Sequence, residues 1–204
     1  MNRRGFAAAC ISAVLFVSGG AWAQQAPDAL IREVAQDVMD TARNDAAIQA
    51  GDVQRIVALV DTKILPHVNF QRMTAAAVGR YWRQATPEQR QRLQDEFKQL
   101  LMRTYAGALS QVKDQQLQMK PMRAAPEDTE VIVRTEVRGR GDPVQVDYRL
   151  EKTANGWKIY DVNVLGVWLV ENYRNTFAQE ISQGGIDGLI SKLAERNKAA
   201  AGQS

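Results

Sequence analysis

The spacing of the apolar residues changes near residue 129, and this change most limits the folds open to the chain. Before that point, apolar residues recur three or four positions apart, which is the spacing of one helical face. After it they alternate: Val144, Val146, Tyr148 and Leu150 are separated by polar residues. A second helical stretch closes the chain. This order predicts an α+β domain with helices packed on one face of an antiparallel sheet.

Capping signals and apolar spacing together predict the helices. Asp52 and Thr86 are suitable N-caps, Pro66 ends a helix, and Pro87 takes a first helical position. Before the sheet, the expected helices have their apolar residues in the ranges 31–42, 53–64, 70–81 and 93–112. After the sheet, helices are expected over 167–181 and 186–197, with Gly184-Gly185 between them and a frayed tail up to Ser204.

The sheet is expected to have about four strands. Alternation predicts strands over 129–138, 144–151 and 157–164, and more weakly over 115–122. Asn155-Gly156 is a strong hairpin signal between the last two of them.

The first residues have the pattern of an export signal. Asn2-Arg3-Arg4 is positively charged, residues 5–20 are uncharged and mostly apolar, and Ala21-Trp22-Ala23 fits a cleavage site. The alternative, a retained anchor, needs a longer apolar run. Because Arg3-Arg4-Gly5-Phe6 also resembles a twin-arginine signal, both the Sec and the twin-arginine routes stay open.

We therefore expect residues 1–23 to be cleaved and residues 24–204 to form a single periplasmic domain. Cys10, the only cysteine, lies inside the signal, so the mature chain has no cysteine for a disulfide, a nucleophile or a metal ligand. Of 26 basic residues, 24 stay after removal of Arg3 and Arg4, against 23 acidic ones. This near balance gives no argument for nucleic acid as a partner.

No motif in the chain predicts catalysis. His67 is the only histidine, follows Pro66 at an expected helix end, and has no serine in a nucleophile elbow to serve. Asp161 is an acidic residue in an otherwise apolar strand. We expect it to be a hydrogen-bonded strand end, although a buried general acid or base stays open as an alternative. No metal, dinucleotide or phosphate-binding motif is found.

Two segments stand out without any catalytic motif. Residues 80–92 mix arginines with aromatic residues, which suits either a solvated helix face or contact with an acidic partner. Residues 162–170 carry no charge and are too short to span a membrane. The second segment either is core or contributes to an apolar cavity.

Three blocks of the sequence resemble the MlaC family, also called the toluene-tolerance or Ttg2-type family of periplasmic proteins. The first runs from Val78-Gly-Arg-Tyr-Trp to Arg90 and on through 97–106. The second is Gly156-Trp-Lys-Ile-Tyr-Asp-Val162 followed by Gly166-Val167. The third is Asn172-Tyr-Arg174 through 184–190. With the signal peptide, the resemblance covers essentially the whole chain.

The resemblance implies a soluble carrier of phospholipid, with acyl chains in a pocket between sheet and helices and the head group outside. It implies no enzyme activity, no metal and no cofactor other than the bound lipid as cargo. Its implied partners are an MCE-domain ring of an inner-membrane ABC transporter and an outer-membrane lipoprotein complex, with outer-membrane lipid asymmetry as the outcome. The carrier is expected to be a monomer.

The candidate pocket walls are periodic apolar residues expected to face the space between helices and sheet. They are Val60, Ile64, Phe70, Tyr81, Phe97, Leu101, Tyr105, Val133, Val146, Tyr148, Leu150, Trp168, Tyr173 and Phe177. Arg80, Arg83 and Arg90 are candidates for head-group or partner contacts. The chain departs from the family at Leu165 and Trp168, where acidic and serine residues are common. A periplasmic enzyme and an envelope adaptor with a fully packed interior are the alternative functions.

Overall fold

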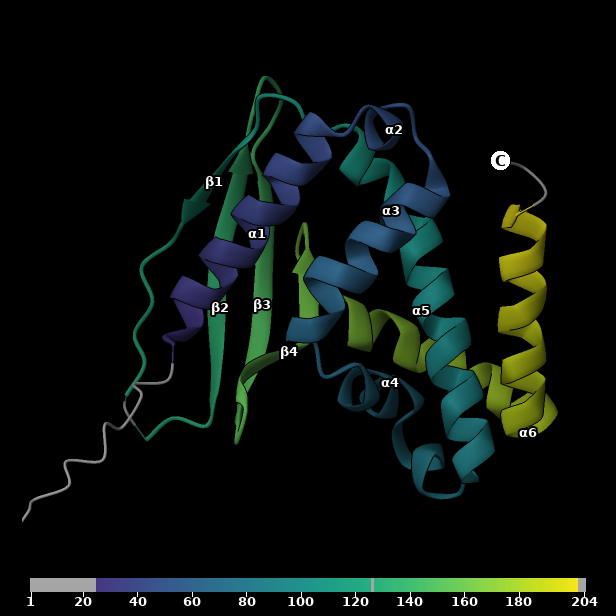
Figure 1. The fold of residues 1–204 in the computed structure, drawn as a ribbon. Helices are drawn as coiled ribbons and strands as arrows, with labels where there is room; N and C mark the ends of the chain where they lie inside the picture. Colours follow the sequence, from purple (N-terminus) through teal and green to yellow (C-terminus); the bar gives the residue numbers. More distant parts are fainter. Residues whose placement is uncertain (1–24, 126, 202–204) are drawn as a thin grey trace, which may run out of the picture.

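The computed structural model describes residues 25–125 and 127–201 (Figure 1), so the expected signal peptide and the last three residues lie outside the described residues. The helical elements are α1 (Pro27–Asn44), α2 (Ala46–Gln49), α3 (Val53–Leu59), the π-helix η1 (Val60–Ile64), the 3₁₀ helices η2 (Leu65–His67) and η3 (Gly79–Arg83), α4 (Phe70–Val78), α5 (Pro87–Ser110) and α6 (Leu169–Ala201). The strands are β1 (Gln116–Met119), β2 (Glu130–Arg138), β3 (Val144–Thr153), β4 (Gly156–Val164) and β5 (Val167–Trp168).

The sheet confirms the predicted α+β class. Its five strands follow one another in the order β1-β2-β3-β4-β5, and every neighbouring pair is antiparallel. The expected strands all form, and the fifth is a two-residue strand that the sequence did not signal. A bulge between Arg149 and Leu150 shifts the register of β3 against β4.

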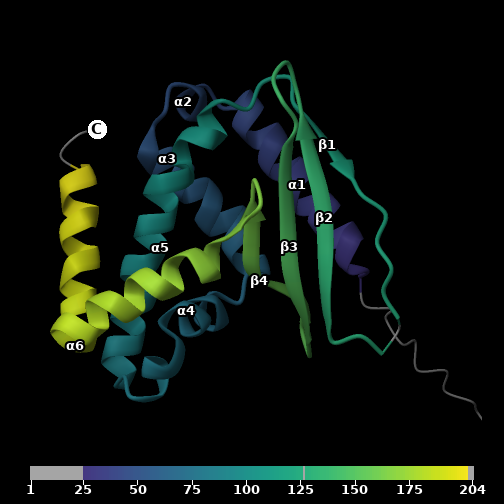
Figure 2. The same cartoon turned by 180° about the vertical axis from the view of Figure 1, so that it is seen from behind.

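The described helices pack on one face of this sheet. α1 packs against β1 and β2, while α4 and α6 pack against β4. Figure 2 shows β2 and β3 from the other side, where no described helix covers them. That outer face carries Glu130, Arg134 and Glu136, which alternate with the buried Val131, Val133 and Thr135. This alternation is typical of an antiparallel sheet with one solvated face.

Local signals set the helix starts as expected. The Asp52 carboxylate accepts a hydrogen bond from the N–H of Arg55 at 3.0 Å. Thr86 and Gln89 form a reciprocal capping box at the start of α5, with Pro87 at the first helical position. Each such cap satisfies backbone donors that have no partner inside the helix.

Three expected helices differ in their course. The helix expected over 53–64 changes to π-helix at Val60. The helix expected over 70–81 stops at Val78, because Gly79 turns the chain with φ 64°. The helix expected from residue 167 begins only at Leu169, since residues 167–168 pair with β4 instead.

The long α6 changes direction at Gly185, whose φ of 67° and ψ of −172° are not helical. Side chains with a Cβ rarely adopt these angles. The predicted break at Gly184-Gly185 is therefore confirmed. The second arm of α6 lies beside α5 in both ribbon views and buries Leu189, Ile190 and Leu193.

Candidate functional site

The apolar interior is divided among three clusters of buried residues. The first lies between α4, α5 and α6 and includes Phe97 and Phe177. The second lies between α1 and the sheet and includes Val133 and Leu150, and the third joins α1, α2, α3 and α5. A single domain usually has one contiguous core. Here the clusters are connected through half-buried residues, namely Val34, Val68 and Val162.

The inner face of the sheet lies where the clusters meet. Val133 pairs with Tyr148, which pairs with Val162 on its other side. Val146 is likewise flanked by Thr135 and Val164. These rows place the predicted residues of β2 and β3 on the face that α1 and α4 cover. Their sequence alternation was a reliable guide because strand side chains have a period of two.

Tyr148 lies partly buried on the inner face of the sheet. Burial raises the pKa of the Tyr148 hydroxyl to about 12, and its hydrogen bond with Thr135 opposes that rise only in part. The hydroxyl therefore lies deep in the protein. The Tyr148 side chain nevertheless keeps accessible surface and is only half-buried.

The helical residues of the predicted set fall into two groups. Phe97 and Phe177 are fully buried, and Phe97 is the centre of a ring cluster. Its ring centroid lies 5.8 Å from Phe70, 5.0 Å from Tyr173 and 5.2 Å from Phe177. The contacts with Tyr173 and Phe177 are edge-on, a geometry that stabilises a core.

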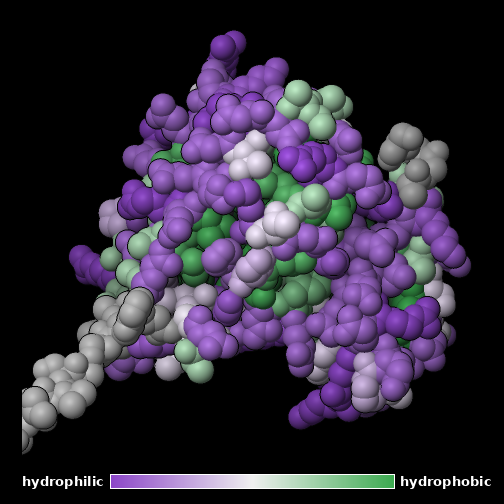
Figure 3. Space-filling view, viewed as in Figure 1, coloured by the Kyte–Doolittle hydropathy of each residue, from purple (hydrophilic) through white to green (hydrophobic). Residues whose placement is uncertain are grey.

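The other helical residues of the predicted set keep accessible surface. They are Val60, Ile64, Phe70, Tyr81, Leu101, Tyr105 and Tyr173. Desolvation raises the pKa of the Tyr105 hydroxyl. Figure 3 shows hydrophobic residues in the middle of one face of the molecule, between α1 and α3, ringed by hydrophilic ones.

Trp168 does not face this interior, contrary to expectation. It pairs with Asn163, whose side chain lies on the opposite face of β4 from Val162 and Val164. The Arg149 guanidinium stacks on the Trp168 ring at 3.9 Å from its centroid. Trp168 lies on the face opposite to the expected one because the two-residue turn before β5 returns the chain antiparallel to β4. A continuous helix from residue 167 would have given Trp168 a different direction.

Asp161 is a structural group at the start of α6. Its Oδ1 accepts hydrogen bonds from the N–H of Val162 at 2.9 Å and of Val170 at 3.1 Å, and its Oδ2 accepts one from Arg149 at 3.0 Å. Burial raises the pKa of the Asp161 carboxyl, and these donors oppose the rise. The prediction of a hydrogen-bonded strand end is confirmed, and both carboxylate oxygens already have partners.

His67 has no catalytic surroundings among the described residues. Burial and the nearby Lys158 lower the pKa of its imidazole. No group of three or more acidic, histidine or cysteine side chains in the described ranges could hold a metal ion. Within the same ranges, no helix is long and apolar enough to cross a membrane.

The three candidate arginines have different surroundings. The Arg90 guanidinium donates to the carbonyls of Trp82 at 3.1 Å and Arg83 at 3.4 Å, and it stacks on the Trp82 ring. Arg90 thus holds the end of η3 and is engaged within the protein. Arg80 and Arg83 are exposed, and Arg80 contacts the hydroxyl of Tyr81 at 2.9 Å. No ion pair with an acidic side chain occupies either of them in the described part of the chain.

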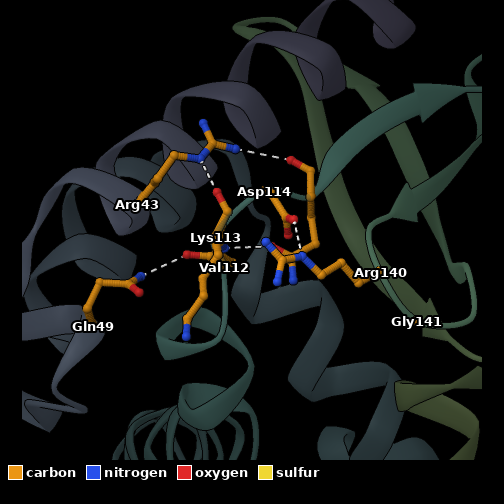
Figure 4. Close-up of a pocket in the computed structure, with 8 residues that line it drawn as sticks. Arg43, Gln49, Val112, Lys113, Asp114, Arg140 and Gly141 are labelled. Carbon is orange, nitrogen blue, oxygen red and sulfur yellow. Dashed lines mark hydrogen bonds and ion pairs between the residues drawn. The ribbon is translucent and has the colours of Figure 1, made fainter.

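A separate surface pocket of about 460 Å³ lies away from the predicted walls (Figure 4). Its lining consists of Arg43, Gln49, Val112, Lys113, Asp114, Gln115, Arg140 and Gly141. Arg43 donates to the carbonyls of Lys113 and Gln115, while Arg140 pairs with Asp114 at 2.9 Å. Because Arg43 bonds backbone carbonyls and Arg140 pairs with Asp114, the pocket has the character of a polar junction between α1, the end of α5 and the sheet.

Comparisons with known proteins agree with this architecture. A solved phospholipid-binding protein from Ralstonia solanacearum, in complex with a phospholipid, shares 50% identity and a TM-score of 0.83, over 85% of this chain and 98% of that one. A curated relative from Pseudomonas putida, toluene tolerance protein ttg2D, is 34% identical over 59% of each chain.

Two further matches concern the family itself. The intermembrane phospholipid transport system binding protein MlaC of Haemophilus influenzae is 24% identical over 88% of this chain and 86% of its own length. The family model for MlaC protein matches residues 32–195. The match spans the helices, the sheet and both arms of α6, and this chain belongs to the MlaC family.

Proposed function

We propose that this protein is a periplasmic phospholipid carrier. The observation that carries the proposal is the half-identical Ralstonia solanacearum protein, which was solved in complex with a phospholipid and matches almost over its full length. The hydrophobic patch between α1 and α3 supports it independently. The family is one of binding and transport proteins rather than enzymes.

Such a carrier has a clear physical task. An acyl chain of about 16 carbons, at roughly 0.8 kcal/mol per CH₂, costs on the order of 12 kcal/mol to expose to water. Apolar walls recover that free energy by removing the chain from water. The task needs no nucleophile, metal or nucleotide in the carrier itself.

The proposed lipid walls are the half-buried members of the predicted set. From the helices they are Val60, Ile64, Phe70, Tyr81, Leu101, Tyr105 and Tyr173, and from the sheet Val146 and Tyr148. The fully buried Phe97, Val133, Leu150 and Phe177 stand behind them as supporting core. Trp168 is left out of the proposed walls because it lies on the other face of the sheet.

The wider transport role is also a proposal. Residues 1–23 direct export and are cleaved, leaving a monomeric domain over residues 24–204. This domain exchanges lipid with an MCE-domain ring of an inner-membrane ABC transporter and with an outer-membrane lipoprotein complex. The exchange maintains outer-membrane lipid asymmetry. Arg80 and Arg83, exposed and without acidic partners, are positioned in sequence beside a proposed wall residue, Tyr81, and suit contact with a phosphate head group.

Native mass spectrometry of gently purified protein tests the lipid cargo, with phospholipid-sized adducts as the expected result. Val146→Trp fills space on the inner face of β3 and should reduce the adducts and the extraction of lipid from vesicles. Gln118→Trp introduces the same ring on an exposed strand position and should leave both unchanged. A wild-type protein that stays lipid-free and extracts no lipid would refute the proposal.

A further inference from the structure

Residues 60–72 form a stretch of the helical layer in which no side chain is fully buried. The chain on both sides of it is well packed, since Leu59 and Met73 are only 4% and 3% exposed. The large apolar members of the stretch are all half-buried, namely Val60, Ile64, Leu65, Val68 and Phe70. Segments with few buried contacts open locally at a low cost in free energy.

The backbone of the same stretch is irregular. α3 passes into the π-helix η1 at Val60, η1 passes into the 3₁₀ helix η2 at Leu65, and a single parallel bridge then joins Val68 to Ile159. Short 3₁₀ turns within a helix often mark a hinge, and π-turns often occur at functional sites. The chain is fixed again at Asn69, whose N–H donates to the carbonyl of Ile159 at 2.8 Å. The η1–η2 segment, residues 60–68, thus lies between the buried end of α3 and this fixed point.

The η1–η2 segment borders all three apolar clusters. Ile64 packs against the cluster of α1, α2, α3 and α5, and Val68 packs against the other two. η1 also contacts α1, where Val34 packs against the second and third clusters. The hydrophobic patch of Figure 3 lies between α1 and α3, the helix that continues into η1. A movement of the segment away from α1 therefore exposes apolar residues of several clusters at once.

Two ion pairs hold η1 to the neighbouring helices. Lys63 pairs with Asp37 of α1 at 2.6 Å, and Asp61 pairs with Lys98 of α5 at 3.4 Å. The four side chains keep between 32% and 52% of their surface accessible. Ion pairs this exposed are weak and are screened by salt. They can therefore break and form again while the rest of the fold stays intact.

We propose that the η1–η2 segment is a gate for the lipid and that the Lys63–Asp37 pair is its latch. The gate opens when this pair breaks and η1 moves away from α1, while the two ends of the segment stay in place. An acyl chain then enters or leaves between α1 and η1, past Val60 and Ile64. The gate rests on the proposed carrier function and adds to it a route for the lipid and a contact that controls the rate of exchange.

The test exchanges the charges of the latch. Asp37→Lys and Lys63→Asp each replace an attraction by a repulsion, and the double variant restores an ion pair of reversed polarity. Each protein is loaded with a pyrene-labelled phosphatidylglycerol, and transfer of this lipid to uncharged phosphatidylcholine vesicles is followed by fluorescence. Each single substitution should speed transfer about fivefold, which corresponds to about 1 kcal/mol. The double variant should return to the wild-type rate.

Asp40→Lys is the matched control, because it makes the same change of charge on α1 but Asp40 pairs with Arg43 of its own helix. It should leave the transfer rate unchanged. Added sodium chloride should speed transfer by wild type, since salt screens the latch, and should not speed transfer by Asp37→Lys. Hydrogen exchange should be faster in the amides of residues 60–68 than in those of α5, and faster still in Asp37→Lys.

Equal transfer rates in wild type and both single variants overturn the gate, as does a double variant that stays as fast as the single ones. Melting temperatures measured without lipid should stay close to that of wild type, because exposed ion pairs contribute little to stability. Native mass spectrometry separates the gate from the carrier function. Lipid adducts with unchanged transfer rates remove the gate alone, whereas a wild type without adducts refutes the carrier function and the gate with it.

Discussion

Phe97→Ala and Leu101→Ala form the sharpest test of which apolar residues are core and which belong to the proposed lipid walls. Both residues lie on α5, four positions apart on the same stripe. Phe97 has no accessible surface and contacts three other rings within 5.8 Å, whereas Leu101 is only half-buried. The sequence treats them alike, whereas the structure buries them to different extents.

The expected loss of unfolding free energy follows from how deeply each side chain is buried. Replacing a buried phenylalanine by alanine costs about 3–5 kcal/mol, which includes the lost ring contacts and the cavity left behind. For a domain of this size each kcal/mol lowers the melting temperature by about 2–4 °C. Leu101→Ala should cost less than about 2 kcal/mol in delipidated protein, because its side chain is only half-buried and its removal leaves a smaller new cavity.

Urea unfolding of delipidated protein, followed by far-ultraviolet circular dichroism, measures both free energies. Native mass spectrometry of the lipid-loaded proteins measures the retained lipid. Leu101→Ala should lose more lipid than its small stability loss explains. Phe97→Leu, which keeps an apolar core, serves if Phe97→Ala does not fold. Equal stability losses for Leu101→Ala and Phe97→Ala would contradict the division into core and wall.

Three further predictions concern pH and backbone. With the Tyr148 pKa at about 12, the unfolded chain ionises first, so stability should fall as pH rises from about 10 towards 12, and Tyr148→Phe should flatten this fall in urea titrations. The pKa of the Asp161 carboxyl is raised above 3.8, so the folded state keeps this proton to a higher pH than the unfolded chain does. The free energy of unfolding should therefore fall as pH rises from about 3.8 through the folded-state pKa. Asp161→Asn should remove that slope, and an unchanged slope would contradict the assignment. Gly185→Ala should lower the free energy of unfolding in urea by about 1–3 kcal/mol, because its positive φ disfavours a side chain. Gly184→Ala, at an ordinary helical φ, should be neutral or stabilising. Equal effects of the two substitutions would contradict the assignment of the kink to Gly185.

Arg72 shows how the helical layer is attached to the edge of the sheet. Its guanidinium pairs with Glu130 and Glu151, each at 2.5 Å, and lies 3.6 Å from the centroid of the Tyr160 ring. These partners come from β2, β3 and β4, while Arg72 belongs to α4. The contacts fix α4 against the strands whose inner face forms the proposed lipid wall.

Elements defined by adjacent residues could be predicted from the sequence. The capping box of Thr86 and Gln89, the alternation along β3 and the break at Gly185 depend on local backbone preferences. The hairpin at Asn155-Gly156 also forms, with Gly156 at φ 106°. Such signals act over a few residues, so their outcome changes little with the surrounding fold.

Which side each residue faces was decided partly by tertiary structure. Trp168 continues an apolar run, yet the tight turn at Leu165-Gly166 places it against Arg149 on the outer face. Arg90 lies in a basic run, yet its guanidinium folds back onto the carbonyls of η3. Neither contact leaves a periodic signal, because each joins residues through a turn.

The sequence by itself determined the α+β class, the helix starts and the set of apolar residues available for an interior. Only the tertiary structure separated Phe97, which packs among rings, from Leu101 and Tyr148, which are half-buried. The physical reason is that hydrophobic spacing records which face turns away from water. Whether that face meets other side chains or an open cavity depends on how distant elements pack together.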